Sequence, residues 1–150
     1  MKTNFKYIFL LLALMVGITC SKKSSTTELP LPDTTKPVLS LIDPTSNKIY
    51  ALGSSLHLQM DLSDNVELKS YKVTITKSLK GVLTSDWSLN QTWQIAAGKK
   101  TFTVNQSEII VPLTVTGNQT TTGNYDLVIT CADTSGNETT TTILIVLNKS

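Results

Sequence analysis

The clearest secondary-structure pattern in the chain is GNYDLVITCADTSGN, residues 123–137. Large apolar side chains recur at every second position in its first ten residues. They are Tyr125, Leu127, Ile129 and Cys131. A repeat of two residues is typical of a strand with one buried face. A Gly-Asn pair, which is a turn signal, closes the stretch. The pattern therefore predicts a strand that leads into a hairpin.

The same repeat appears in other parts of the chain. Residues 56–62 and 71–75 alternate apolar and polar side chains, Thr and β-branched residues are frequent, and no amphipathic helix is evident. Seven strands are predicted, at residues 38–42, 54–63, 68–77, 87–96, 101–111, 124–132 and 140–147. Seven short strands separated by turn signals predict an all-β fold, a Greek-key β-sandwich.

The first twenty residues have the pattern of a bacterial export signal. Two lysines precede an apolar run from residue 7 to residue 18. At about 12 residues this run is too short to span a membrane, which takes roughly 20, and it suits a secretory signal. The sequence Gly-Ile-Thr-Cys at residues 17–20 resembles a lipobox, in which lipid is attached to the cysteine. We predict a lipoprotein signal peptide at residues 1–19 and acylation of Cys20, with an ordinary cleaved signal as the alternative.

Residues 21–37 separate the predicted lipid site from the strands. Ser, Thr, Lys and Pro dominate this segment, which holds three of the five prolines of the chain. Such a composition buries little surface and stays extended. The predicted organisation is therefore a lipidated cysteine with a flexible tether at residues 20–37, followed by a β-sandwich at residues 38–150.

The charge balance disfavours a nucleic-acid partner. The chain has 13 basic and 11 acidic residues, and all the basic ones are lysines. Lys2 and Lys6 leave with the signal peptide, so the mature chain has 11 basic and 11 acidic residues. Nucleic-acid binding normally needs a cationic surface and guanidinium groups.

Acidic and amide residues gather in loops that a sandwich would bring to one end. They are Asp33, Asp64, Asn65, Glu67, Asp133 and Asn137. Ca²⁺ requires oxygen ligands of this kind from several loops, so these residues are candidate calcium ligands. The same residue types also form turns without any ligand. No other cofactor is predicted, because one histidine and two cysteines are too few for a metal cluster.

Two tryptophans are candidates for a binding surface. Trp87 and Trp93 share the parity of Leu89 and Ile95, which favours packing into the core. Tryptophan on a β-surface can also stack on a sugar ring, with a side chain such as Asn90 bonding the sugar hydroxyls. Trp87, Trp93 and Asn90 are therefore candidate glycan-binding residues, with core packing as the alternative for the two rings.

Cys131 and His57 are the remaining reactive side chains of the predicted domain. Cys20 is assigned to lipid, so Cys131 has no disulfide partner, and its parity predicts a buried thiol that behaves as a small hydrophobe. Alternation places His57 on the outer face of its strand. A Ser-His-Asp site needs a histidine held by a carboxylate beside a nucleophile, and no motif indicates one. We expect no catalytic residues and no enzymatic activity.

The strand and turn motifs resemble those of bacterial immunoglobulin-like domains. Residues 123–137 resemble the penultimate strand and final hairpin of such domains, and DTTKP at residues 33–37 with SDNVEL at residues 63–68 resembles their opening. The stretch from about 33 to 148 is similar to a family of Ig-like lipoproteins of unknown function from Bacteroidota. This resemblance implies an Ig-like sandwich with a tyrosine corner at Tyr125.

The resemblance also bears on metal binding and on location. Members of that family often carry histidines after the third strand and beside the corner tyrosine, where this chain has residues 77–81 and Asp126. No metal role therefore carries over. Surface-exported lipoproteins of that phylum often carry acidic residues after the lipidated cysteine, and this chain has lysines. An outer-membrane lipoprotein that faces the periplasm is therefore favoured over one at the cell surface.

These patterns predict a lipid-anchored binding or adhesion module of the cell envelope. Its expected partners are the membrane, through the N-terminal lipid, and an envelope protein or glycan. Two alternatives are an accessory glycan-binding lipoprotein that uses Trp87 and Trp93, and a passive structural subunit whose edge strands pair with other chains. The loops at residues 43–53, 78–86 and 112–124 point away from the tether and are expected to meet a partner first.

Overall fold

The described part of the chain is entirely β-structure. The computed structural model describes residues 31–79 and 83–149, and within them the chain has ten strands and no helix. The all-β prediction is therefore confirmed. Accordingly, none of the described residues belongs to a helix that could cross a membrane. The predicted signal peptide, the acylation of Cys20 and most of the tether lie outside the described residues.

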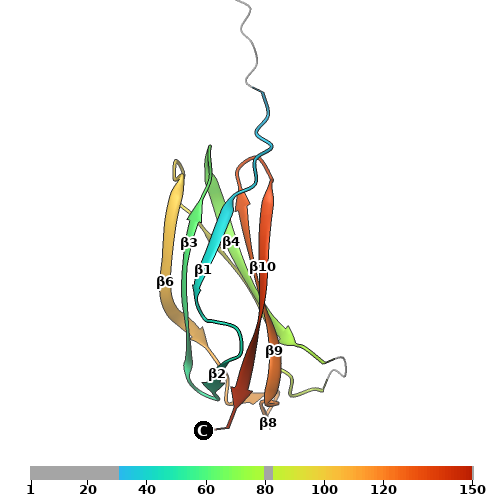
Figure 1. Cartoon of the computed structure of the whole chain (residues 1–150). Helices are drawn as coiled ribbons and strands as arrows, with labels where there is room; N and C mark the ends of the chain where they lie inside the picture. The colour runs from blue at the N-terminus through green and yellow to red at the C-terminus, as the bar shows by residue number, and fades with distance from the viewer. Residues whose placement is uncertain (1–30, 80–82, 150) are drawn as a thin grey trace, which may run out of the picture. The chain divides into compact units, whose positions relative to one another are not determined.

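Two sheets form the sandwich (Figure 1). One contains, in spatial order, β1 (Val38–Asp43), β3 (Ser55–Ser63) and β6 (Thr101–Ile110). The other contains, in spatial order, β2 (Lys48–Ala51), β10 (Glu138–Asn148), β9 (Gly123–Asp133), β4 (Leu68–Lys77) and β5 (Leu89–Gln94). A separate two-stranded ribbon is formed by β7 (Thr114–Val115) and β8 (Asn118–Gln119). Neighbouring strands run antiparallel, except that β2 is parallel to β10.

The seven predicted strands are all present, and each begins and ends within two residues of its expected position. The three short strands β2, β7 and β8 were not predicted. After β1 the chain changes sheets at the cis peptide bond between Asp43 and Pro44. It then pairs with β10 as β2. The first two strands of the domain are therefore edge strands, β1 in one sheet and β2 in the other.

The core consists of the inward side chains that the two-residue repeat predicts. The fully buried ones include Leu58 of β3, Val73 of β4 and Leu127 of β9, none of which has exposed surface. Cys131 is also fully buried among them, and burial raises the pKa of its thiol to about 11. The run from residue 143 to residue 147 is apolar on both faces, and it lies in β10, between β2 and β9 rather than at an edge.

Tyr125 forms the tyrosine corner that the resemblance implies. Its ring is completely buried, and its hydroxyl donates a hydrogen bond of 2.7 Å to the carbonyl oxygen of Thr121. The backbone N–H of Trp87 donates to the same hydroxyl over 3.4 Å. This single side chain ties the start of β9 to the segment that precedes β5.

The unit that contains the sandwich begins before the first strand. The chain divides into two units, Met1–Leu31 and Pro32–Ser150. Residues 33–37, which their composition assigns to the tether, belong to the second unit. Asn137 donates a side-chain hydrogen bond to the carbonyl oxygen of Asp33, and Thr139 donates one to that of Pro37.

Candidate functional site

A cavity of about 300 Å³ opens between the two sheets, where β5 and β6 are the edge strands. Its walls come from β4, β5 and β6 and combine aromatic rings with amide, hydroxyl and carboxylate groups. The lining residues are Tyr71, Trp93, Gln94, Phe102, Thr103, Val104, Asn105, Gln106 and Glu108. This volume is at the lower end of the range for small-molecule sites, and a mixed apolar and polar lining is typical of them.

The aromatic wall is built by a cross-strand pair. Tyr71 of β4 lies opposite Trp93 of β5, and their rings stack with centroids 5.1 Å apart and planes 8° apart. Phe102 of β6 also contacts this group, with its ring centroid 6.4 Å from that of Tyr71. Trp93 is only partly buried, so part of its ring remains available to a molecule in the cavity.

The polar wall comes from β6. The Nε2 of Gln106 donates a hydrogen bond of 3.1 Å to the Tyr71 hydroxyl. Burial raises the pKa of Tyr71 to about 12, with a further contribution from the negative charge of Glu108. The hydroxyl therefore stays protonated at any physiological pH and can act as both hydrogen-bond donor and acceptor.

An irregularity in β6 shapes this wall. Gln106 pairs with Leu58 of β3, whereas Ile109 pairs with Leu56, so β6 has one more residue than β3 between these pairs. Such a β-bulge shifts the inward parity of a strand. Inward positions before it are Phe102, Val104 and Gln106, and after it Ile109 is the buried residue. The bulge thus brings Glu108 to the rim of the cavity.

The structure separates the three residues predicted to bind a glycan. Trp87 is only 8% exposed and packs against Tyr125, with ring centroids 6.4 Å apart. Trp87 therefore belongs to the core, which was the alternative to glycan binding. Trp93 lines the cavity. Asn90 lies on β5 opposite Thr74 of β4, is exposed, and is not part of the cavity lining.

Of the six candidate calcium ligands, three come together. Asp33, Asp64 and Asp133 each offer a carboxylate oxygen within 4.8 Å of the other two. Asn65 and Asn137 are neighbours whose amides donate hydrogen bonds to Asp33 and Asp133. The six residues are therefore three clustered carboxylates, two supporting amides and Glu67, whose carboxylate is not part of the group.

The carboxylate of Glu67 contacts a different loop instead. Its carboxylate accepts a hydrogen bond of 2.6 Å from the backbone N–H of Gly98, and its own N–H is bound to Asp64. Its carboxylate thus fastens the loop between β5 and β6, and its backbone belongs to the turn that holds Asp64.

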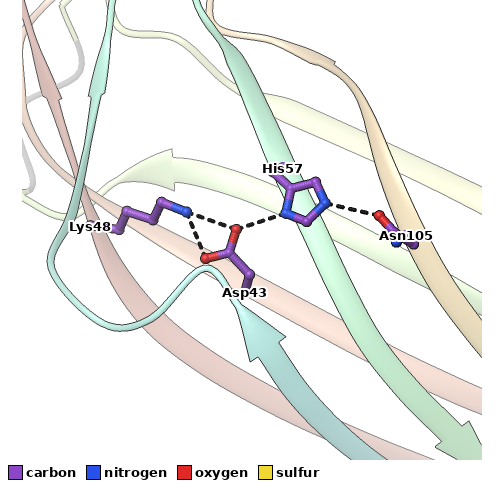
Figure 2. A network of polar contacts seen from close by, with 4 residues as sticks. All are labelled: Asp43, Lys48, His57 and Asn105. Carbon is purple, nitrogen blue, oxygen red and sulfur yellow. Dashed lines mark hydrogen bonds and ion pairs between the residues drawn. The ribbon is translucent and has the colours of Figure 1, made fainter.

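His57 belongs to a polar network on the outside of the smaller sheet (Figure 2). Its Nδ1 lies 2.9 Å from Asp43 Oδ2, and its Nε2 lies 2.9 Å from Asn105 Oδ1. Asp43 also accepts two hydrogen bonds from Lys48 Nζ, at 2.6 and 2.7 Å. The network joins β1, β2, β3 and β6. Both ring nitrogens are engaged, which leaves neither to activate a hydroxyl nucleophile.

The acceptors around His57 shift its acid–base properties. Hydrogen bonding to Asn105 and to Asp43 raises the pKa of the imidazole above its usual 6.5. Desolvation opposes ionisation of Asp43, but the hydrogen bonds from Lys48 and His57 together outweigh it and lower the pKa of that carboxyl. An ionised carboxylate facing an imidazolium is therefore the favoured state at mildly acidic pH.

Sequence reasoning did not find Tyr71, Phe102, Gln106 and Glu108 as cavity residues. One pattern could have indicated the polar wall: Gln106 follows Phe102 and Val104 at the same inward parity, and an amide in that position is unusual. The contribution of Glu108 depends on the bulge, which no local sequence pattern in β6 reveals.

Comparisons with known proteins identify a family. A family model described as a domain of unknown function (DUF4625) matches residues 18–148. No curated protein matches the sequence.

Several solved structures are similar at low identity. CopC from Methylosinus trichosporium OB3b is 13% identical, with a TM-score of 0.37 over 75% of this chain and 95% of that one. The sporulation control protein Spo0M from Bacillus subtilis is 12% identical, with a TM-score of 0.38 over 77% of this chain and 49% of that one. A beta-glucosidase from Listeria innocua is 14% identical, with a TM-score of 0.37 over 75% of this chain and 16% of that one. These similarities are too remote to carry an argument about ligands or activity.

Proposed function

We propose that this chain, which belongs to the DUF4625 family, is a lipid-anchored, non-enzymatic binding module of the cell envelope that holds a saccharide in the cavity between β5 and β6. The observation that carries the proposal is the lining of this cavity. A stacked aromatic pair, Tyr71 and Trp93, stands beside the amide of Gln106 and the carboxylate of Glu108.

This combination matches the chemistry of a sugar. A pyranose ring has an apolar C–H face that packs against an aromatic ring, and hydroxyl groups at its edge that need donors and acceptors. Trp93 offers the aromatic surface, while Tyr71, Gln106 and Glu108 offer polar partners. A volume of about 300 Å³ suits one sugar unit of a larger glycan rather than a long stretch of it.

The chemistry of the site favours binding over hydrolysis. Glycoside hydrolysis normally uses a pair of carboxylic acids on either side of the scissile bond. Among the residues that line the cavity, Glu108 is the only carboxylate. His57 is held by Asp43 and Asn105, which supports a structural role for the imidazole.

The envelope location is inferred from the N-terminal sequence. The apolar run and the lipobox-like residues 17–20 support export and acylation at Cys20. Acyl chains hold a protein at a membrane because each buried CH₂ group contributes about 0.8 kcal/mol. We place the module on the outer membrane, facing the periplasm, where envelope polysaccharides are within its reach.

The test begins with the purified full-length protein on an array of envelope polysaccharides and peptidoglycan fragments. Saccharides that bind are then titrated by calorimetry against Trp93→Ala and Asn90→Ala. We expect Trp93→Ala to weaken binding about tenfold, because an aromatic contact contributes about 1.4 kcal/mol. Asn90→Ala is the matched control: it lies on the same strand, outside the cavity, and should bind like the wild type.

Thermal melts followed by circular dichroism establish that both variants are folded. Equal affinities for the wild type and Trp93→Ala would rule out the cavity as the binding site. A wild type that binds no saccharide but captures an envelope protein would show that the saccharide assignment is wrong. Failure of both assays would favour the passive structural subunit.

A further inference from the structure

The cluster of three aspartates lies where the chain enters the sandwich. Asp33 precedes β1, Asp64 lies between β3 and β4, and Asp133 is the last residue of β9. These segments are far apart in the sequence, yet one carboxylate oxygen from each lies within 4.8 Å of the other two. Figure 1 shows the turn after β3 and the hairpin between β9 and β10 at the end of the sandwich where the chain enters.

In two of these carboxylates, one oxygen accepts hydrogen bonds and the other has no hydrogen-bond partner among the described residues. Oδ1 of Asp33 accepts hydrogen bonds from the Thr35 N–H and the Asn65 amide, both at 3.0 Å. Oδ2 of Asp64 accepts from the N–H groups of Val66 and Glu67, at 2.8 and 2.7 Å. These donors fix the orientation of both carboxylates.

The opposite oxygens are buried without a partner. Oδ2 of Asp33 and Oδ1 of Asp64 have almost no exposed surface, and no group in the described part of the chain donates to either. A buried carboxylate oxygen left unpaired is strongly unfavourable. Because the donors already occupy the other oxygen of each carboxylate, these two oxygens are the atoms left to accept a partner.

The charges around the three aspartates also favour a cation at this point. Asp133 is only 1% exposed, and its two oxygens accept the N–H and the amide of Asn137. The ion pairs found among the described residues both involve Asp43, so no described lysine or histidine neutralises the three aspartates. Lys100 donates to the carbonyl oxygen of Asn65, a neighbour of Asp64, and forms no ion pair with the three aspartates. Three close carboxylates without a cation repel one another.

We propose that Asp33, Asp64 and Asp133 form a Ca²⁺ site that fastens the entering chain to the sandwich. Ca²⁺ binds oxygen at 2.3–2.6 Å, so oxygens on opposite sides of one ion lie up to about 5 Å apart. The spacing in the cluster fits this geometry. A group of three carboxylates with no imidazole or thiolate ligand matches a hard cation rather than Zn²⁺. Water completes the coordination shell.

The site is separate from the saccharide cavity. None of its three carboxylates lines that cavity, so either proposal can fail without the other. A bound ion would join residue 33 to the β9–β10 hairpin and to the turn after β3. The domain would then hold the last residues of the tether more firmly when Ca²⁺ is present.

The test uses the full-length protein, stripped of metal with EGTA. CaCl₂ and, separately, MgCl₂ are titrated in by calorimetry, and thermal unfolding is followed by circular dichroism with and without each ion. We expect one Ca²⁺ per chain, with a dissociation constant in the range of about 10⁻⁵–10⁻³ M. The unfolding temperature should rise with Ca²⁺ concentration, because the ion binds only the folded chain, and Mg²⁺ should bind more weakly.

Asp64→Asn is the informative variant. Asparagine keeps an oxygen that can accept the Val66 and Glu67 N–H groups, so the turn is retained while one charge is lost. We expect Ca²⁺ affinity to fall at least about tenfold, because the charge count of the ligands sets the affinity. Without Ca²⁺ the variant should melt at the same temperature as the wild type or higher, because a repulsive charge is gone. With saturating Ca²⁺ the wild type should melt higher.

Asp86→Asn is the matched control. Asp86 also has one oxygen that caps a turn, through the Leu83 N–H, and one buried oxygen without a partner, but it belongs to no acidic group in the described residues. Its substitution should leave Ca²⁺ binding unchanged. The proposal is overturned by a wild type that shows neither heat nor a melting shift up to about 10 mM Ca²⁺. Equal effects of the two substitutions, or Mg²⁺ binding as tight as Ca²⁺ binding, would also overturn it.

Discussion

At the residue scale, His57 shows that a sequence pattern can place a side chain correctly without revealing its partners. The two-residue repeat puts it on the outer face of β3, and the structure agrees, with 39% of the side chain exposed. Its partners come from other strands: Asp43 ends β1 and Asn105 lies in β6. Alternation within one strand carries no information about partners on neighbouring strands, so the network was not foreseen.

The network predicts a pH dependence of stability. The pKa of His57 is raised above 6.5 in the folded chain. Its contribution to the free energy of unfolding is therefore complete below pH 6.5 and is lost as pH rises through the folded pKa. The pKa of Asp43 is lowered below 3.8, so its contribution is present above 3.8 and is lost as pH falls through the lowered pKa. The network therefore stabilises the fold most between these limits.

Urea unfolding of the wild type and His57→Gln measures this effect. We expect the loss of unfolding free energy in the variant to be larger at about pH 5.5 than at about pH 8.5. Gln keeps a polar side chain on the outer face but cannot carry the charge. The same difference at both pH values would mean that the ionised state of His57 contributes nothing.

A second prediction at this scale concerns two buried tyrosines. Tyr125→Phe removes the hydroxyl that binds the Thr121 carbonyl and the Trp87 N–H. Losing a buried partner leaves those groups unsatisfied, which costs about 1–3 kcal/mol of unfolding free energy.

Tyr50→Phe is the control, because the Tyr50 hydroxyl is buried and has no hydrogen-bond partner among the described residues. Its removal should leave the stability unchanged or increase it, since an unpaired buried hydroxyl is itself unfavourable. Urea unfolding curves of both variants give the comparison. A larger loss in Tyr50→Phe than in Tyr125→Phe would contradict the tyrosine-corner interpretation.

At the element scale, long strands were predictable and short ones were not. β3, β4 and β9 each span several two-residue repeats, so the alternation of apolar and polar residues is enough to identify their buried faces. β2 has four residues, and β7 and β8 have two each. A strand that short contains too little of the repeat to be recognised. β2 forms because its distant partner β10 completes its hydrogen bonds, whereas β7 and β8 pair with each other in a local hairpin.

The bulge in β6 explains why the candidate site was only partly predictable. Trp93 could be singled out because a large ring at a repeating position is visible in the sequence. Glu108 could not, because its place depends on one additional residue in β6 relative to β3. The separation of Trp87 from Trp93 has a similar origin: the paired part of β5 begins at Leu89, so Trp87 lies outside the strand and packs under Tyr125.

At the scale of the whole domain, the candidate binding site lies on a side of the sandwich rather than in the loops that were expected to meet a partner. The described parts of those loops, residues 43–53, 78–79, 83–86 and 112–124, lie at the end opposite the entering chain (Figure 1). The cavity instead opens between the edge strands β5 and β6. A sandwich whose two sheets have unpaired edges next to each other leaves room between them, and the side chains at that opening determine what can bind.

The last prediction concerns the anchor and involves both cysteines of the chain. Cells that express the wild type, Cys20→Ser or Cys131→Ser are labelled with a fatty-acid probe and separated into membrane and soluble fractions. We expect label and membrane association in the wild type and in Cys131→Ser, because the Cys131 thiol is buried and burial raises its pKa to about 11. Cys20→Ser should lose the label and the membrane association together, because the acyl chains supply the affinity. Label that persists in Cys20→Ser, or unlabelled wild-type protein in the cytosol, would contradict the proposed anchor while leaving the cavity and the aspartate cluster to be judged by their own tests.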